Sequence, residues 1–295
     1  TRLGDNVFKD CLTLTNVVMG TNVTHIGTNA FYDCPAMTNI AIGSYVSNIE
    51  DQAFYYCPGL TSVTIPDGVA RIGSLIFYNC PGLTNITLGS GLVNIGDAAF
   101  YYCTSLTSVT IPNGVTAIRF NTFYNCTSLT NVTIPSSVTS IGAQAFEMCT
   151  ALPGITIPSS VTSIENYAFD FCTSLTSITV PSGVTAIKDY VFYYCTSLTN
   201  VVLPSGLTNI GISAFWSCTN LPGVSIHAGV TNIGDYAFSS CAGLGSVTIP
   251  NSVARIGQQA FFVCSSLTNV FIGIGTTTIG TWAFQRRTNL ASIAV

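Results

Sequence analysis

The chain has 295 residues, of which 48% are hydrophobic and only 7% are charged, and its formal net charge is −4. Its eight Lys and Arg residues are scattered, which excludes the clustered basic surface that a nucleic-acid partner needs. No apolar run approaches the roughly 18 residues that cross a bilayer. We therefore expect no nucleic-acid partner and no transmembrane segment, and the hydrophobic residues should line a long, thin core.

A 23-residue repeat organises the whole sequence, without insertion or deletion over thirteen copies. Cysteine follows the repeated phenylalanine by three residues from Cys11 through Cys264, whereas the thirteenth copy has Arg287 instead. Such a strict period is typical of a solenoid. The repeated phenylalanines are Phe8, Phe31, Phe54, Phe77, Phe100, Phe123, Phe146, Phe169, Phe192, Phe215, Phe238, Phe261 and Phe284.

Each copy begins with a predicted strand, for which residues 103–126 serve as the example. The stretch from Leu106 through Val109 to Ile111 alternates between apolar and polar residues in its later part, from Val109, and is rich in β-branched side chains. Pro112 ends it, because proline lacks the N–H group that a strand ladder needs. We predict one short strand in this part of each copy.

The second half of each copy predicts another wall and a tight bend. Val115 and Ile118 form an apolar pair, and a Gly such as Gly96 or Gly142 then usually precedes x-x-Ala-Phe-x-x-Cys, whose spacing predicts a single helical turn. Residues that cap helical turns follow this position in nine of the thirteen copies. These residues are Asp5, Thr28, Asp51, Ser74, Asp97, Asn166, Asp189, Asp235 and Thr281.

Stacking is the way in which so short a copy can bury its apolar side chains, because each copy then covers the next. The strands must run parallel, about 4.8 Å apart, so that thirteen coils form a rod of roughly 60 Å. We predict one β-rich solenoid domain over residues 1–295, with a parallel sheet, short helical turns and no dedicated capping units.

The motif Leu-x-x-Val-x-Ile-Pro-x-x-Val-x-x-Ile-Gly-x-x-Ala-Phe-x-x-Cys resembles the BspA-like class of leucine-rich repeat, and the resemblance covers the whole chain. It implies a right-handed, curved leucine-rich repeat solenoid. It also implies an extracellular or cell-surface protein that acts in adhesion, of a kind common on bacterial surfaces and found in some protist surface proteins; of these two sources we expect the bacterial one. The family has no fixed ligand, so the resemblance does not identify one.

Twelve cysteines invite a disulfide interpretation, but the geometry of a solenoid argues against it. Equivalent residues of adjacent coils point the same way about 4.8 Å apart, whereas a disulfide needs β-carbons about 3.8 Å apart that converge. We expect a column of buried free thiols. No Cys-x-x-Cys is present, so the sequence predicts no metal site and no cofactor.

No set of residues predicts catalysis. His25 and His227 are the two histidines and lie almost nine copies apart. Gly273 and Gly275 lack the third glycine of a dinucleotide-binding loop. Aspartates such as Asp51 recur two coils apart, about 10 Å, which is too far for two of them to share a calcium ion. We expect a protein that is not an enzyme.

An aromatic stripe follows the repeated phenylalanine. Neighbours in sequence cannot all face inward, so some rings must reach solvent, where they could stack on sugars or pack against another rod. The alternative is that the rings stack on one another and only cover the turn. The stripe comprises Tyr32, Tyr55, Tyr56, Tyr78, Tyr101, Tyr102, Tyr124, Phe171, Tyr193, Tyr194, Trp216 and Phe262.

A threonine column marks the middle of successive strands. Regular threonines can order water as ice-binding surfaces do, although threonine is also simply a residue that suits an exposed strand position. The column comprises Thr64, Thr87, Thr110, Thr133, Thr156 and Thr179.

The two ends of the sequence are complementary, because the chain starts within one copy and finishes with a strand. In a head-to-tail stack Arg286 would lie over Asp10, a pair that is worth about 0–1 kcal/mol when exposed. The expected end-to-end interface comprises Asp10, Leu14, Val17, Arg286, Leu290 and Ile293. The alternative is that the chain is a fragment of a longer surface protein.

Two functions remain open at this point. The first is a non-enzymatic extracellular structural or adhesive repeat protein that assembles head to tail into a filament, with itself as partner. The second is a surface recognition module that binds a glycan or a host protein through its strand face or its aromatic stripe.

Overall fold

The computed structural model describes residues 1–286 and 289–294, which form two compact units, Thr1–Leu152 and Pro153–Val295. Arg287, which replaces the repeated cysteine in the last copy, lies outside the described residues. Each unit is a stack of coils joined by parallel strands, so the predicted parallel-sheet solenoid is confirmed. The prediction of one domain over residues 1–295 stays a prediction.

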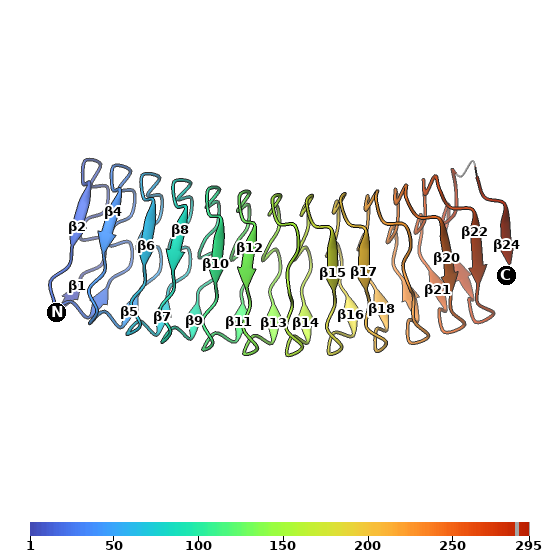
Figure 1. Ribbon diagram of the computed structural model, residues 1–295, viewed down its shortest axis with the longest axis horizontal. Coiled ribbons are helices and arrows are strands. Elements are labelled where there is room, and N and C mark those ends of the chain that lie inside the picture. The colour runs from blue at the N-terminus through green and yellow to red at the C-terminus, as the bar shows by residue number, and fades with distance from the viewer. Residues whose placement is uncertain (287–288, 295) are drawn as a thin grey trace. The chain divides into compact units, whose positions relative to one another are not determined.

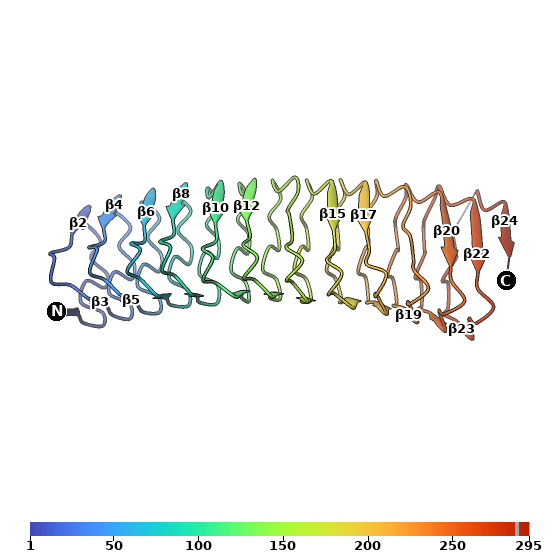
Figure 2. The same cartoon turned by 60° about the horizontal axis from the view of Figure 1, so that its bottom comes forward.

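The N-terminal unit carries two rows of strands, which we call the front row and the side row (Figures 1 and 2). The front row consists of β2 (Asn16–Val18), β4 (Asn39–Ala41), β6 (Ser62–Thr64), β8 (Asn85–Thr87), β10 (Ser108–Thr110) and β12 (Asn131–Thr133). The side row consists of β1 (Arg2–Leu3), β3 (His25–Ile26), β5 (Asn48–Ile49), β7 (Arg71–Ile72), β9 (Asn94–Ile95), β11 (Ala117–Ile118) and β13 (Ser140–Ile141).

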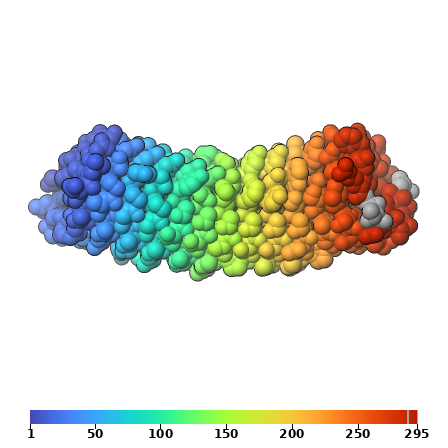
Figure 3. All heavy atoms as spheres, turned by 90° about the horizontal axis from the view of Figure 1, so that it is seen from above, coloured from blue at the N-terminus to red at the C-terminus, as the bar shows by residue number. Residues whose placement is uncertain are grey.

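The C-terminal unit has the same two rows. Its front row consists of β15 (Ser177–Thr179), β17 (Asn200–Val202), β20 (Ser246–Ile249), β22 (Asn269–Ile272) and β24 (Ser292–Ala294). Its side row consists of β14 (Ser163–Ile164), β16 (Ala186–Ile187), β18 (Asn209–Ile210), β19 (Asn232–Ile233), β21 (Arg255–Ile256) and β23 (Thr278–Ile279). In the space-filling view the atoms of successive coils form bands in chain order within each unit (Figure 3).

Strand pairing keeps a register of one repeat throughout each unit. Val109 pairs with Val132 and Ile210 pairs with Ile233, each 23 residues further along the chain. Like residues therefore lie beside like residues, and the inward columns are continuous within each unit. The rings of Phe100 and Phe123, for example, stack with their centroids 5.3 Å apart.

The turn segment between the side row and the next front strand differs from the helical turn that the sequence predicts. Among the described residues there is no helix, and residues 96–103 form successive tight turns instead. Ala98 and Tyr102, two residues before and after Phe100, have φ angles of 52° and 60°, which a right-handed helical turn does not contain. The spacing of Phe and Cys fits both geometries, so the pattern could not distinguish them.

In these turns every second backbone N–H group points toward the next coil. Ala98 donates to the carbonyl of Phe120 at 2.8 Å, Phe100 to that of Thr122 at 2.9 Å, and Tyr102 to that of Tyr124 at 2.9 Å. The turn segments therefore form a third hydrogen-bonded ladder beside the two strand rows. It satisfies backbone groups that a stack of isolated turns would leave unpaired.

The aspartates after the bend join coils and do not cap helices. Asp51 accepts the N–H of Ser74 at 2.8 Å, and Asp235 accepts that of Gln258 at 2.8 Å, each 23 residues further along. The sequence predicted that these aspartates accept a hydrogen bond from an N–H group of their own turn. They do accept a backbone N–H, but the donor lies in the next coil.

Two segments of the front row, residues 152–158 and 221–227, form no strand. Both read Leu-Pro-Gly where most other copies read Leu-Thr-Asn or Leu-Thr-Ser. Elsewhere the residue in the proline position donates its N–H to the preceding coil, as Thr199 does to Thr176 at 2.9 Å. Pro153 and Pro222 cannot donate, so this bond to the preceding coil is missing at both positions. Gly154 still forms an isolated parallel bridge with Ser177 of the next coil. In Figure 1 the front row has no arrow between β17 and β20.

Candidate functional site

The cysteines form a thiol column within each unit and no disulfide, so the predicted free thiols are confirmed. All are buried except Cys11, in the first coil, which is half-buried. The Sγ of Cys103 donates to the carbonyl of Phe77 at 3.2 Å, and the same bond recurs from Cys126 to Phe100. Burial raises the pKa of the Cys103 thiol to about 12. A protonated, enclosed thiol is neither a nucleophile nor a metal ligand.

The aromatic stripe of the N-terminal unit is a ladder of rings that cover one another. Tyr32, Tyr55, Tyr78, Tyr101 and Tyr124, the tyrosine ladder, stack with centroids 4.5–4.8 Å apart and interplanar angles of 3–6°. Each interior ring therefore has both faces covered, and the ladder presents edges and hydroxyl groups to solvent. Sugar stacking needs a free ring face, which the interior rings do not offer.

The tyrosine ladder has a cation at one end and a carboxyl group at the other. The Nζ of Lys9 lies 4.7 Å from the centroid of Tyr32, a cation–π contact. At the far end Glu147 accepts a hydrogen bond from the amide of Gln144 at 2.9 Å. Burial raises the pKa of Glu147, and hydrogen bonds from Gln144 and Tyr124 oppose that rise. Both groups stabilise the ends of the ladder.

The other tyrosines that the sequence singles out in this unit, Tyr56 and Tyr102, lie outside the ladder. Both are exposed and have positive φ angles of 57° and 60°. The ring of Tyr102 is tilted by 40° against that of Tyr101. These two side chains present more of their rings to solvent than the ladder does.

In the C-terminal unit the stripe is less regular. Tyr194 stacks on Phe171 at 4.9 Å, whereas Trp216 meets Tyr193 edge-on at 5.4 Å. Three tyrosines that we did not include in the stripe join it, because they lie two residues before the phenylalanine on the same side of the turn. They are Tyr167, Tyr190 and Tyr236.

The front face is the surface formed by the outward side chains of the front row. In β10, Ser108 and Thr110 are exposed and flank buried Val109, and β8 and β12 repeat the pattern with Asn and Thr. A shallow groove of about 380 Å³ runs between β8 and β10, and its lining contains no charged residue. The threonine column predicted in this unit lies on this face, and its ordering of water stays a prediction.

The 221–227 segment opens a second groove in the front face, of about 470 Å³, which we call the 221–227 groove. Its walls come from β17, from the segment itself and from β20. The sequence carries the signal for it, Pro222 followed by Gly223, which our prediction from sequence did not use. Its lining residues are Asn200, Val201, Gly223, Val224, Ser225, Ile226, Ser246 and Thr248.

His227 closes the end of this segment, in the position that proline occupies in the neighbouring copies. Its Nε2 lies 2.9 Å from the carbonyl oxygen of Leu203. Because a carbonyl oxygen only accepts, Nε2 carries the hydrogen. Within residues 1–286 and 289–294, no group of three His, Cys, Asp or Glu side chains has the arrangement of a metal site.

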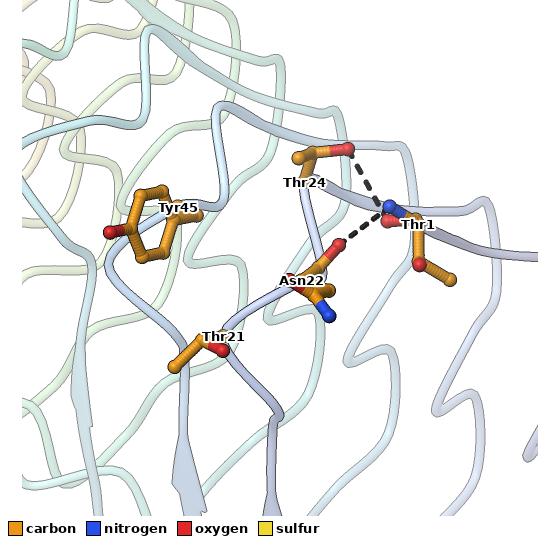
Figure 4. Close-up of a pocket in the computed structure, with 5 residues that line it drawn as sticks. All are labelled: Thr1, Thr21, Asn22, Thr24 and Tyr45. Carbon is orange, nitrogen blue, oxygen red and sulfur yellow. Dashed lines mark hydrogen bonds between the residues drawn. The ribbon is translucent and has the colours of Figure 1, made fainter.

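An open hollow of about 690 Å³ lies at the first coil, lined by Thr1, Thr21, Asn22, Thr24 and Tyr45 (Figure 4). The Thr1 ammonium donates to the carbonyl of Asn22 at 2.5 Å, and the Thr24 hydroxyl donates to the carbonyl of Thr1 at 3.3 Å. None of the five residues that line it is Asp, Glu, His, Cys, Lys or Arg, which makes it a poor candidate for chemistry.

The residues of the expected end-to-end interface lie on the first and last coils. Leu14 and Val17 are half-buried, whereas the equivalent Leu60 and Val63 are at most 3% exposed. In the C-terminal unit Leu290 is half-buried and Ile293 is 49% exposed. Arg286 and Asp10 are both exposed, and the Arg286 guanidinium lies 5.8 Å from the Phe262 ring.

Comparison with known proteins gives one family and several similar structures. The BspA type leucine rich repeat region, in six copies, matches residues 1–127, 93–222 and 185–295. A leucine-rich repeat protein from Bacteroides ovatus is 26% identical over 94% of this chain and 86% of its own, with a TM-score of 0.68. The leucine-rich repeat protein of T. pallidum is 31% identical over 59% of this chain and 82% of its own, with a TM-score of 0.55.

A leucine rich cell surface protein from Faecalibacterium prausnitzii is 26% identical over 100% of this chain and 87% of its own, with a TM-score of 0.48. The comparison with curated proteins found no significant match. No helix among the described residues is long and apolar enough to span a membrane.

Proposed function

Because this chain belongs to the BspA-type leucine-rich repeat family, we propose that it is a non-enzymatic, extracellular adhesive scaffold that binds its partner on the front face. Repeats of this family form scaffolds for protein interaction. Solenoids of this kind bind along extended faces, because every coil contributes the same few outward positions.

The observation that carries the proposal is the composition of the front face. In β6, β8, β10 and β12 the outward positions hold Ser or Asn at the first residue and Thr at the third, all exposed. Each of these side chains donates and accepts hydrogen bonds, and they recur at the strand spacing of about 4.8 Å. An array of neutral polar groups favours a partner that is itself polar and repetitive.

The hydroxyl groups beside the front row are already committed to the fold. Thr84 donates its hydroxyl to the carbonyl of Thr61 at 3.0 Å, and Thr199 does so to Thr176 at 3.0 Å. These threonines therefore fasten coils together. Among the described residues, the outward Ser, Asn and Thr of β6, β8, β10 and β12 have no such bond and are left for a partner.

An adhesion assay with the whole protein tests this proposal. Beads that carry the chain should be retained on a mucin-coated surface. Thr87→Glu with Thr110→Glu should reduce that retention at least about tenfold, because two carboxylates would project into the contact and repel the acidic glycans of mucin. The control is Val93→Glu with Thr116→Glu, at exposed positions of adjacent coils that lie outside the front row.

Equal retention of both double variants would place the contact elsewhere on the chain. In that case Tyr101→Ala with Tyr102→Ala tests the aromatic stripe as the binding surface. Loss of retention with this pair alone would favour recognition through the stripe. No retention of the unaltered protein on mucin or on other glycoproteins would contradict adhesion.

Head-to-tail self-association is the second candidate. It is favoured by the partly exposed Leu14, Val17 and Ile293, whose equivalents in interior coils are buried. A second copy could cover these side chains and continue the parallel ladders. Light scattering over a range of concentrations should show growing particle mass, and Ile293→Lys should suppress it, whereas an invariant monomer mass would contradict the filament.

A further inference from the structure

We propose that the 221–227 groove is a binding site for a neutral oligosaccharide, with the exposed ring of Phe271 as its stacking platform. The proposal deepens the adhesive function above, because it assigns one place on the front face and one ligand class. It depends on the interruption of the front row, on the freed groups that this interruption leaves, and on one aromatic side chain.

The interruption leaves two strand edges inside the C-terminal unit. β17 ends the sheet that begins with β15, and β20 begins the sheet that continues with β22 and β24. Within the described residues, the main chain of residues 223–226 makes no hydrogen bond to another residue, whereas Thr248 and its neighbours in β20 pair with β22. The groove therefore contains peptide donors and acceptors that the fold does not use.

The polar side chains of the groove are equally uncommitted. Asn200, Ser246 and Thr248 are exposed and, among the described residues, have no side-chain hydrogen bond. Ser225 contributes another exposed hydroxyl. One amide and three hydroxyl groups thus point to a ligand that both donates and accepts hydrogen bonds.

An apolar floor lies beneath these groups. Val224 and Ile226 are half-buried, although the equivalent Val247 and Ile249 in the next coil are at most 2% exposed. The lapse of the ladder at Pro222 exposes them. Sugar rings have a C–H face as well as hydroxyl edges, so a groove with an apolar floor and polar rims matches both parts of a saccharide.

Phe271 supplies an aromatic ring on the same face. It is 52% exposed, it pairs in register with Thr248 of the groove, and its ring stacks on no other ring among the described residues. The other positions of this column hold small or β-branched residues. They are Val18, Ala41, Thr64, Thr87, Thr110, Thr133, Thr156, Thr179, Val202, Ser225, Thr248 and Ala294. A free ring face is what the tyrosine ladder lacks and what sugar stacking needs.

Charge and space select among possible ligands. No residue that lines the groove is Asp, Glu, Lys or Arg, so nothing there pairs with an ionic ligand. The volume of about 470 Å³ falls in the range of small-molecule sites. A peptide cannot add as a strand, because residues 221–227 already lie between β17 and β20. A neutral oligosaccharide of a few sugars, extended from the groove toward Phe271, remains.

The test uses the whole labelled protein on an array of neutral and anionic oligosaccharides. We expect retention on one or more neutral members, followed by saturation transfer from protein to that sugar in NMR. Phe271→Thr places the residue that is commonest in this column at position 271, so the fold should be kept, and the affinity should fall at least about tenfold.

The matched control is Phe120→Ala, which removes an exposed ring, 48% accessible, from the other unit. It should leave the affinity unchanged, and Asn200→Ala with Ser246→Ala should weaken it as Phe271→Thr does. Binding to anionic members alone, to no member, or unchanged binding by Phe271→Thr would each overturn the proposal.

The outcome is separable from that of the adhesion assay. Retention of beads without binding of free neutral sugars would reject the groove and keep the scaffold. Sugar binding without retention of beads would keep the groove and reject adhesion.

Discussion

Each inward side chain touches its own equivalent in the neighbouring coil, so one residue type per position has to satisfy a whole column. Phenylalanine does so by stacking, as between Phe215 and Phe238 at 5.1 Å. Cysteine does so because its thiol is small and can donate to the carbonyl at its side, as Cys218 does to Phe192 at 3.2 Å. Both residues fill the column without a polar atom left unpaired.

Alkaline pH should unfold the protein through these thiols. Burial raises the pKa of Cys103 to about 12 from an ordinary 9.0, so the folded state holds the proton more tightly than the unfolded state. The stabilisation is complete below pH 9 and is lost as the pH rises toward 12, by up to about 1.4 kcal/mol per pH unit for each thiol.

Urea titrations across this pH range measure the free energy of unfolding. Cys103→Ala removes one titrating group, and its free energy of unfolding should fall less steeply with pH than that of the unaltered chain. Parallel slopes for the two proteins would show that the buried thiols do not control alkaline unfolding.

At the scale of the element, the front strands follow from their apolar alternation and the groove follows from one proline. Leu106, Val109 and Ile111 predicted their strand, because apolar residues that alternate with polar ones and include β-branched side chains are typical of a strand. The turn segment was less predictable, since the spacing of Phe100 and Cys103 fits a helical turn and the chain there has positive φ angles on either side of the phenylalanine.

The groove could have been predicted only in part. Pro222 in a strand position indicates an interruption, and that much is legible in the sequence. Val224 and Ile226 are half-buried because of how far the coil moves when one hydrogen bond is missing. The sequence pattern does not predict the size of that movement. The aromatic stripe is a second example. The sequence predicted which positions along the coils hold aromatic rings, but it did not predict that neighbouring rings cover one another's faces.

Restoring the missing donor should close the groove. Pro222→Thr gives the coil the N–H and the hydroxyl that Thr199 uses in the preceding coil, so the free energy of unfolding should rise by about 0.5–1.5 kcal/mol. Chemical denaturation measures the gain. Thr84→Pro is the reciprocal change, because it removes two bonds to Thr61, and it should lower the free energy of unfolding by about 1–3 kcal/mol.

A destabilised Pro222→Thr would mean that the proline relieves strain at this coil and that the groove has another origin. The same variant should also bind neutral oligosaccharides more weakly, since Val224 and Ile226 would return to the interior.

On the scale of the whole molecule, stability comes from columns of apolar residues and very little from charge. The described residues contain four ion pairs, and all four are at least partly exposed to solvent. Exposed pairs contribute about 0–1 kcal/mol each and weaken as salt is added. Each unit instead buries continuous columns of Leu, Val, Ile, Phe and Cys side chains.

The melting temperature should therefore depend little on salt. Raising NaCl from about 10 mM to about 150 mM shortens the screening length from ~30 Å to ~8 Å. We expect the melting temperature to shift by less than about 3 °C, measured by calorimetry. A larger fall would show that charges on the surface contribute more than the contacts of the four pairs indicate.

The unbonded cysteines also determine how the chain would respond to a pulling force. With no disulfide between coils, each 23-residue coil can peel from its neighbour and lengthen the tether by roughly 70 Å. Because only hydrogen bonds and apolar contacts part, a released coil can wind back onto the stack when the load is removed. A protein that holds two surfaces together would thereby yield in small, recoverable steps under shear.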